Sequence, residues 1–103
     1  MIVEILYIDD CPSHRQLLPT VRRLAEQAGA ELRQRRITTR RQAERERFLG
    51  SPTVRVNGLD VEPGAAERSD YGLKCRIYRP SALPPSPTPP RDWIEAALAR
   101  NWA

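Results

Sequence analysis

Two residues near the start of the chain have the types and the spacing for sulfur chemistry. Cys11 stands three positions before His14, the only histidine in the 103 residues, within the stretch IDDCPSH (8–14). A cysteine thiolate is a nucleophile, and a neighbouring imidazole can favour it when protonated or accept the thiol proton when neutral. The same spacing places sulfur and imidazole on one side of a helix start, where they could hold a soft metal ion. The residues alone leave both chemistries open.

Two predicted elements position this pair. The apolar, β-branched run IVEILYI (2–8) is typical of a strand buried on both faces, and therefore central in a sheet with parallel neighbours. A helix follows Cys11: Pro12 suits its first position, and Gly29 suits its C-terminal cap. Pro19 lies within this helix and predicts a kink. The apolar positions at helical spacing are Leu17, Leu18, Val21, Leu24, Ala25 and Ala28.

Cys11 would therefore lie at the N-terminus of a helix, which favours a reactive thiol over an inert one. A helix N-terminus presents free backbone amides and a partial positive charge, and both stabilise a thiolate. Asp9 and Asp10 act in the opposite direction, because nearby carboxylates disfavour another negative charge. The sequence does not settle which effect is larger.

The middle of the chain predicts an edge strand, a short helix and a hairpin. Residues 30–37 (AELRQRRI) form a very polar strand that suits the edge of a sheet. Thr39 and Gln42 make a capping-box pair that opens a charged helix ending near residues 48–49. The stretch TVRVNGLDVE (53–62) alternates on both sides of an Asn-Gly pair, which is typical of a hairpin with a type I′ turn.

The last third of the chain is less regular. KCRIYR (74–79) could add another strand. Residues 80–90 hold six of the ten prolines, which excludes a helix or a central strand and predicts an extended loop. A final helix runs from residue 91 to the C-terminus, with Asp92 in its first turn. Its apolar stripe is Ile94, Ala97 and Leu98, and its packing aromatics are Trp93 and Trp102.

The predicted order is strand, helix, strand, helix, hairpin, helix, without an internal repeat. A βαβ unit followed by a ββα unit packs helices on both faces of one mixed sheet, with a right-handed first crossover. We therefore predict an α/β fold with a central sheet of four strands, or five if residues 74–79 join it. The 103 residues are expected to form one domain, in which residues 62–90 are an irregular insertion.

Two local motifs resemble the thioredoxin-like superfamily, most closely its glutaredoxin-type members. CPSHRQLLPTVRRLA (11–25) looks like the active-site helix of thioredoxin, with Cys11 at the helix start, His14 at the second functional position and Pro19 as the kinking proline. SPTVRVNG (51–58) looks like the cis-proline loop and the hairpin after it. The resemblance implies a thioredoxin-like fold and thiol–disulfide exchange at Cys11.

The resemblance also implies a substrate groove. Pro52 should follow a cis peptide bond, a specific expectation because only about 5–6% of X-Pro bonds in folded proteins are cis. In that family the cis-proline loop lies beside the nucleophilic sulfur and presents backbone groups to a bound thiol substrate. The implied substrate is a protein disulfide or a conjugate of a low-molecular-weight thiol. The implied substrate-binding residues are Pro12, Ser13, Ser51, Pro52 and Thr53.

The chain departs from the family pattern at two places. His14 stands where the dithiol motif has its second cysteine, and Asp10 stands where a tryptophan often precedes the first one. The motif therefore lacks its usual resolving thiol. Glutathione or another small thiol could resolve a mixed disulfide at Cys11 as a co-substrate, or Cys75 could do so where disulfide geometry allows. The alternative is a non-catalytic module that binds a soft metal or a partner through Cys11, with His14 as a second metal ligand.

A second, narrower resemblance points to mercury chemistry. SPTVRVNGLDVEP (51–63) followed by CRIY (75–78) resembles short bacterial proteins described as alkylmercury-lyase-like. It implies thiolate attack on mercury or an organomercurial, or thiolate binding of the metal. This function ranks third, after thiol–disulfide exchange and the non-catalytic binding module.

The composition narrows the partners and the compartment. The formal net charge is +4, and sixteen of the seventeen basic residues are arginine. Thirteen acidic residues are interleaved with them, and no aromatic residues alternate with them, so we expect a solvated surface and no nucleic-acid partner. No stretch approaches the roughly 20 apolar residues of a membrane span. The start MIVEILYI lacks the features of a signal peptide, so we expect a cytoplasmic protein with two free thiols.

Overall fold

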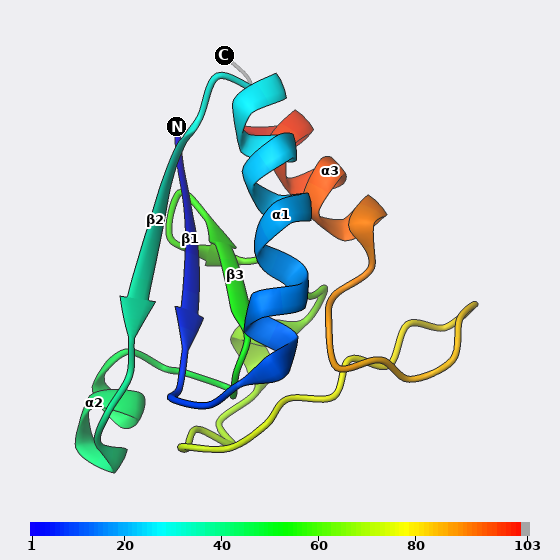
Figure 1. Ribbon diagram of the computed structural model, residues 1–103. Coiled ribbons are helices and arrows are strands. Elements are labelled where there is room, and N and C mark those ends of the chain that lie inside the picture. Colours follow the sequence, from blue (N-terminus) through cyan, green and yellow to red (C-terminus); the bar gives the residue numbers. More distant parts are fainter. Residues whose placement is uncertain (102–103) are drawn as a thin grey trace.

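Four strands in the order β2-β1-β3-β4 form one mixed sheet, and helices pack against it (Figure 1). The computed structural model describes residues 1–101. The elements are β1 (Ile2–Tyr7), α1 (Pro12–Gln27), β2 (Glu31–Arg36), α2 (Arg40–Arg45), β3 (Thr53–Val56), β4 (Leu59–Asp60), the 3₁₀ helix η1 (Ala65–Glu67) and α3 (Arg91–Arg100). The predicted α/β class with a mixed four-stranded sheet is confirmed.

The apolar strand β1 lies at the centre of the sheet and the polar strand β2 lies at one edge, both as predicted. The expectation that β1 has parallel neighbours holds for β2 but is wrong for β3, because the chain enters β3 from the end of the sheet where β1 finishes. β1 pairs with β2 in parallel and with β3 antiparallel, and β3 pairs with β4 antiparallel. Since β1 and β3 run in opposite directions, the end of β1 and the start of β3 lie at the same end of the sheet (Figure 1). The residues of functional interest gather at that end.

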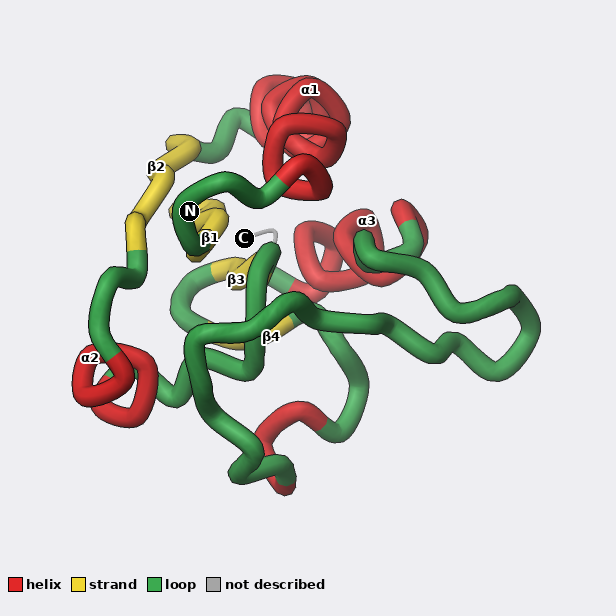
Figure 2. The backbone as a smooth tube through the Cα atoms, turned by 60° about the horizontal axis from the view of Figure 1, so that its bottom comes forward, coloured by secondary structure: helices red, strands yellow, loops and turns green. Residues whose placement is uncertain are grey.

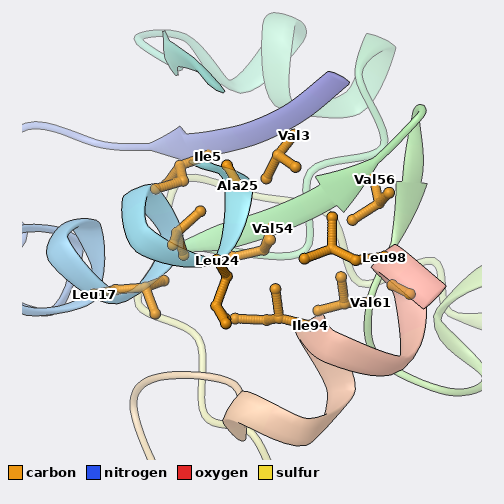
Figure 3. Packing of buried hydrophobic residues seen from close by; sticks show 12 residues of the cluster. Val3, Ile5, Leu17, Leu24, Ala25, Val54, Val56, Val61, Ile94 and Leu98 are labelled. Atoms are coloured by element: carbon orange, nitrogen blue, oxygen red, sulfur yellow. The ribbon is translucent and has the colours of Figure 1, made fainter. Parts of the chain in front are cut away.

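The main core lies between one face of the sheet and the helices α1 and α3 (Figure 3). Val3 and Ile5 of β1 point to this face, as do Val54 and Val56 of β3, because alternate strand residues share a face. The helices contribute Leu17, Val21, Leu24, Ala25, Ile94, Ala97 and Leu98, and Val61 completes the cluster.

A smaller core lies on the other face, where α2 packs. There Leu6 of β1 packs with Ile37, Ala43 and Phe48, all of which are buried. Leu6 and its neighbour Ile5 thus point to opposite faces of the sheet. The prediction of helices on both faces is confirmed.

Local capping explains where α1 ends. The helix continues through Pro19 and stops at Gln27. Gly29 adopts the left-handed conformation expected of a C-terminal cap, with φ of 67°. The amide of Gly29 bonds to the carbonyl of Glu26, and the amide of Ala30 bonds to that of Ala25, which is the Schellman pattern.

The short helix α2 begins where predicted but ends earlier. Thr39 caps it, because its side chain accepts a hydrogen bond from the Gln42 amide at 3.0 Å. The Gln42 side chain accepts from the amide of Thr38 rather than that of Thr39, so the capping box is offset by one residue. The expected end near residues 48–49 is wrong: α2 stops at Arg45, since Arg47 adopts a left-handed conformation with φ of 55°.

The predicted hairpin is present as β3 and β4. Its two turn residues, Asn57 and Gly58, both have positive φ (49° and 83°), as a type I′ turn requires. Asn57 also accepts a hydrogen bond from the amide of Ile2 and donates one to Asn101, joining the turn to both ends of the described chain.

Residues 61–90 contain no strand of the sheet and only the short helix η1. The fifth strand considered for residues 74–79 is absent from the described part of the chain; two isolated bridges pair Cys75 with Ser51 and Tyr78 with Ser86. The proline-rich segment is an extended loop, as predicted, and projects from the side of the molecule (Figures 1 and 2). α3 follows it, and Trp102 lies outside the described residues. None of the described helices has the length and apolar character needed to cross a membrane.

Candidate functional site

Cys11 is the N-cap residue of α1, directly after the end of β1. Its backbone is extended (φ −98°, ψ 101°), and Pro12 takes the first helical position. The thiol makes no capping hydrogen bond, and the residue is 5% exposed. The first turn of α1 holds no acidic residue, and Asp10 directly precedes Cys11. The position expected to stabilise a thiolate is therefore occupied by Cys11.

His14 is held by contacts to strands β1 and β2. Its ring stacks on Tyr7, with ring centroids 3.9 Å apart and an interplanar angle of 7°. Its Nε2 lies 2.9 Å from Oε1 of Gln34. Since Oε1 is an acceptor, Nε2 donates this bond, and in the neutral ring Nδ1 is the nitrogen that can accept a proton. Within residues 1–101 no hydrogen bond joins His14 to Cys11.

The loop before β3 contains the expected cis proline. The Ser51–Pro52 bond is cis, which confirms that prediction. Ser51, Pro52 and Thr53 are all buried. The Ser51 hydroxyl accepts a hydrogen bond from the amide of Ile8 at 3.1 Å, and the Thr53 hydroxyl donates one to the carbonyl of Gly50 at 2.6 Å. The first bond ties the loop to the β1–α1 connection, three residues before Cys11.

Cys75 lies on the other side of Ser51. The two residues form an isolated parallel bridge: the Ser51 amide donates to the carbonyl of Lys74 at 2.8 Å, and the Arg76 amide donates to the carbonyl of Ser51 at 3.0 Å. Cys75 is exposed, and both cysteines are free thiols. We call residues Lys74–Arg76 the strap. Figure 2 shows this end of the molecule from below, with the connections crossing it.

The structure therefore brings the sequence-predicted site residues to one end of the sheet. Cys11 and Ser51 belong to segments joined by a hydrogen bond, and Cys75 belongs to a segment paired with Ser51. Pro12 is exposed and Ser13 is half-buried at the start of α1. The backbone of Ser51, expected to face a substrate, already pairs with the strap.

A buried arginine within the strap is a feature that the sequence analysis did not predict. Arg76 is 2% exposed. Its guanidinium bonds to both carboxylate oxygens of Asp60, at 2.8 and 3.0 Å, and to Glu62 at 3.3 Å. It also donates to the Thr53 hydroxyl at 2.9 Å. Burial disfavours the charge of Arg76, but the hydrogen bond and charge of Asp60 and the charge of Glu62 offset this and raise its pKa.

Tyr78 continues the same buried cluster. Its ring lies under the Arg76 guanidinium, with the guanidinium carbon 4.4 Å from the ring centroid. Its hydroxyl donates a hydrogen bond to the carbonyl of Pro52. The side chain is fully buried, and burial raises the pKa of the phenol well above its usual value. Arg76 and Tyr78 thus fix the strap against the loop that carries Pro52.

The only sequence signal for this cluster is weak. Residues 75–78 alternate, and Arg76 and Tyr78 are the buried pair while Cys75 and Ile77 are exposed. Alternation predicts that one face of the segment is buried. It does not predict that an arginine lies on that face, because a buried charge requires ion-pair partners, and these partners are distant in the sequence. Asp60, its main partner, lies sixteen residues away at the end of the hairpin.

Surface ion pairs flank the site without entering it. Asp9, two residues before Cys11, lies 3.6 Å from Arg36 of β2. Asp70 pairs with Arg68 at 2.7 Å and with Lys74 of the strap at 2.9 Å. Hydrogen bonds from Arg68 and Lys74 hold the pKa of Asp70 well below its usual value.

The described residues do not assemble a larger metal site. Within residues 1–101 there is no group of three or more histidine, cysteine, aspartate or glutamate side chains placed to hold a metal ion. A metal at this end of the sheet would have Cys11 and His14 as its candidate ligands, and Nε2 of His14 already donates to Gln34.

Comparisons with known proteins assign no family. No protein-family model matches the chain, and neither a curated protein nor a solved structure matches it.

Proposed function

We propose that the chain is a thioredoxin-like thiol protein in which Cys11 carries out thiol–disulfide exchange. The observation that carries this proposal is the position of Cys11 as the N-cap of α1, at the end of the central strand and next to the cis-proline loop. A helix N-terminus stabilises a thiolate, and a thiolate is the species that attacks disulfides. The mixed sheet of four strands and the cis bond before Pro52 support the proposal.

The proposed reaction proceeds in two exchanges. The Cys11 thiolate attacks one sulfur of a substrate disulfide, forms a mixed disulfide with it and releases the other sulfur as a thiolate. A second thiolate then attacks the Cys11 sulfur, forms a disulfide with it and releases the remaining substrate thiol. If Cys75 supplies that thiolate, the product is a Cys11–Cys75 disulfide, which two molecules of a small thiol reduce. If a small thiol such as glutathione attacks, the mixed disulfide with Cys11 is reduced by another small thiol.

His14 is proposed to adjust the protonation of Cys11 rather than to bind substrate. The stack on Tyr7 and the bond to Gln34 hold the ring in one orientation, one turn into the helix that Cys11 caps. With Nε2 donating to Gln34, Nδ1 is the nitrogen available as a proton acceptor. Replacing His14 with alanine should therefore slow the attack of Cys11 without abolishing it, because the helix N-terminus remains.

The first experiment measures exchange with an aromatic disulfide whose released thiolate absorbs visible light. The proteins compared are the wild type, Cys11→Ser, Cys75→Ser and His14→Ala. We expect Cys75→Ser to keep most of the first-exchange rate, Cys11→Ser to lose most of it, and His14→Ala to fall several-fold. Mass spectrometry of the quenched Cys75→Ser reaction should find the aromatic thiol on Cys11.

The exposed thiol of Cys75 provides the matched control. Cys75 is exposed and lies outside every described helix, so it lacks the helix N-terminus that distinguishes Cys11. If Cys11→Ser reacts as fast as the wild type while Cys75→Ser does not react, the chemistry belongs to a surface thiol and the proposed function is wrong. If the Cys75→Ser protein reacts once but no longer turns over with limiting small thiol, Cys75 is the resolving thiol.

A further inference from the structure

The backbone of Ser51 is already fully paired. Its amide bonds to the carbonyl of Lys74 and its carbonyl accepts from the amide of Arg76, while its hydroxyl accepts from the amide of Ile8. An extended peptide that binds by adding a strand needs free backbone groups at the edge it joins. At Ser51 those groups are taken by the chain itself.

The strap that occupies this edge is built into the core. Arg76 is held by Asp60, Glu62 and Thr53, and two residues later Tyr78 is fully buried against the carbonyl of Pro52. Releasing the strap would remove the Arg76 guanidinium from the partly buried carboxylate of Asp60, which would lose two hydrogen bonds and its ion-pair partner. Glu62 would keep only its ion pair with Arg68. The strap is therefore a fixed part of the site.

The next free edge lies one strand beyond Ser51, on the outer side of the strap. In this parallel bridge the amide and carbonyl of Ser51 bond to Lys74 and Arg76, the two neighbours of Cys75. The amide and carbonyl of Cys75 itself therefore point away from Ser51. A peptide that paired along this outer edge would be displaced by about 4.8 Å, the spacing of adjacent strands. Pairing on that edge therefore does not give a peptide cysteine the position, relative to Cys11, that pairing at Ser51 would give it.

We infer that the strap restricts the substrates of Cys11 to low-molecular-weight thiols and disulfides, and excludes extended peptides that bind by strand addition at Ser51. This inference rests on the proposed function and chooses between the two substrate classes that it leaves open. A small disulfide requires no backbone pairing, so a closed edge at Ser51 does not hinder it. Lys74, Cys75 and Arg76 thus act as the specificity-determining segment of the site.

The test compares two mixed disulfides that release the same aromatic thiolate. One carries N-acetylcysteine amide, and the other a ten-residue extended peptide with a single central cysteine between alternating apolar and polar residues. Both are reacted with the Cys75→Ser protein, so that Cys11 is the only thiol, and both rates are divided by the rate with free dithiothreitol. We expect the small substrate to react at least 10-fold faster after this correction.

Three outcomes distinguish a failure of this inference from a failure of the proposed function. A peptide that reacts as fast as the small substrate, or faster, overturns the inference and leaves the proposed function intact. A lack of Cys11 exchange with both substrates overturns the proposed function and the inference with it. A preference of 10-fold or more for the small substrate in the Cys75→Ser protein supports both, provided that the Cys11→Ser protein, whose only thiol is Cys75, shows no such preference.

Backbone hydrogen exchange tests the strap directly, without any variant. The amides of Ser51 and Arg76 should exchange as slowly as those of β3, because they donate the bonds that close the edge. The amide of Cys75 is the internal control, since it makes no backbone hydrogen bond within the described residues. If the Ser51 and Arg76 amides exchange as fast as that of Cys75, the strap opens readily and the inference fails.

Discussion

At the scale of single residues, Arg76 does most to define this site. A fully buried arginine is rare, because removing its charge from water is costly unless every donor finds a partner. Here Asp60 and Glu62 supply the counter-charge and Tyr78 supplies a ring face. Only Nε is buried without a hydrogen-bond partner among the described residues. The cluster therefore ties the hairpin, the strap and the cis-proline loop together through one side chain.

Replacing Arg76 with methionine should lower the free energy of unfolding by about 3 kcal/mol, because the partly buried carboxylate of Asp60 loses its ion-pair partner, whereas Glu62 keeps Arg68. The matched control is Arg79→Met, which changes an exposed arginine three residues away and should cost less than about 0.5 kcal/mol. Urea unfolding of the three proteins measures both effects. Equal costs for the two substitutions would mean that the cluster adds no stability.

The buried phenol of Tyr78 should make the folded protein lose stability at alkaline pH. Burial raises the pKa of its phenol in the folded state, whereas the unfolded chain ionises near the ordinary value of about 10. Unfolding is then favoured by ionisation, so the stability supplied by the neutral phenol is present below about pH 10 and is lost as the pH rises above it. The loss should approach about 1.4 kcal/mol per pH unit.

The measurement is urea unfolding between pH 8 and 11 for the wild type and Tyr78→Phe. The variant is expected to be less stable at pH 8, because the carbonyl of Pro52 loses its donor. Above pH 10 its stability should fall less steeply than that of the wild type, since phenylalanine does not ionise. If the free energy of unfolding falls with pH equally in the two proteins, ionisation of Tyr78 does not cause the loss of stability.

At the scale of elements, short-range chemistry sets the boundaries. The Thr39 side chain accepts from the Gln42 amide and so starts α2, which positions Ala43 and the following Phe48 in the smaller core. We expect Thr39→Ala to cost about 1 kcal/mol of unfolding free energy, the usual value of an N-cap. Arg41→Ala, on the exposed side of the same helix, should cost less than about 0.5 kcal/mol. Chemical denaturation measures the cost of each substitution. Equal costs would show that the Thr39 side chain does not stabilise the start of α2.

The elements that could be predicted from the sequence are those with local signals. β1 is a continuous apolar run, α1 has a helical stripe with Gly29 at its end, and the Asn57–Gly58 pair marks its turn directly. The placement of Cys11 at the helix start followed from the same signals. The cis bond before Pro52 was expected only from the family resemblance, not from any local preference.

The strap could not be predicted, because its partners are distant in the sequence. Arg76 pairs with Asp60 across sixteen residues, and the bridge of Cys75 to Ser51 spans an even longer separation. No period or turn motif encodes such a contact. The orientation of the His14 ring could not be predicted for the same reason. Helical spacing placed His14 near Cys11, but the residues that orient its ring, Tyr7 and Gln34, come from two strands.

At the scale of the whole molecule, the sheet separates two cores that share no residue. Ile94 belongs to the larger core under α1 and α3, and Ile37 belongs to the smaller one beside α2. Each isoleucine is 1% exposed. The loss of one methylene group from either isoleucine should therefore disturb the packing on only one side of the sheet.

We expect Ile94→Val and Ile37→Val each to cost about 0.5–1.5 kcal/mol of unfolding free energy. The double variant should cost the sum to within about 0.5 kcal/mol, because distant sites without shared partners are additive. Denaturant unfolding of the four proteins completes the cycle. A coupling energy above about 1 kcal/mol would show that the sheet transmits strain between the two cores.

The ionic centre of the strap also makes its hold on the cis-proline loop depend on temperature. The hydration of charged groups becomes less favourable on warming, so the cost of keeping the Arg76 guanidinium and its carboxylates away from water falls as the temperature rises. Cooling has the opposite effect and also weakens the apolar packing around them. The end of the sheet that carries Cys11 should thus be held most firmly in the warm part of the protein's stability range, and cold should loosen it first.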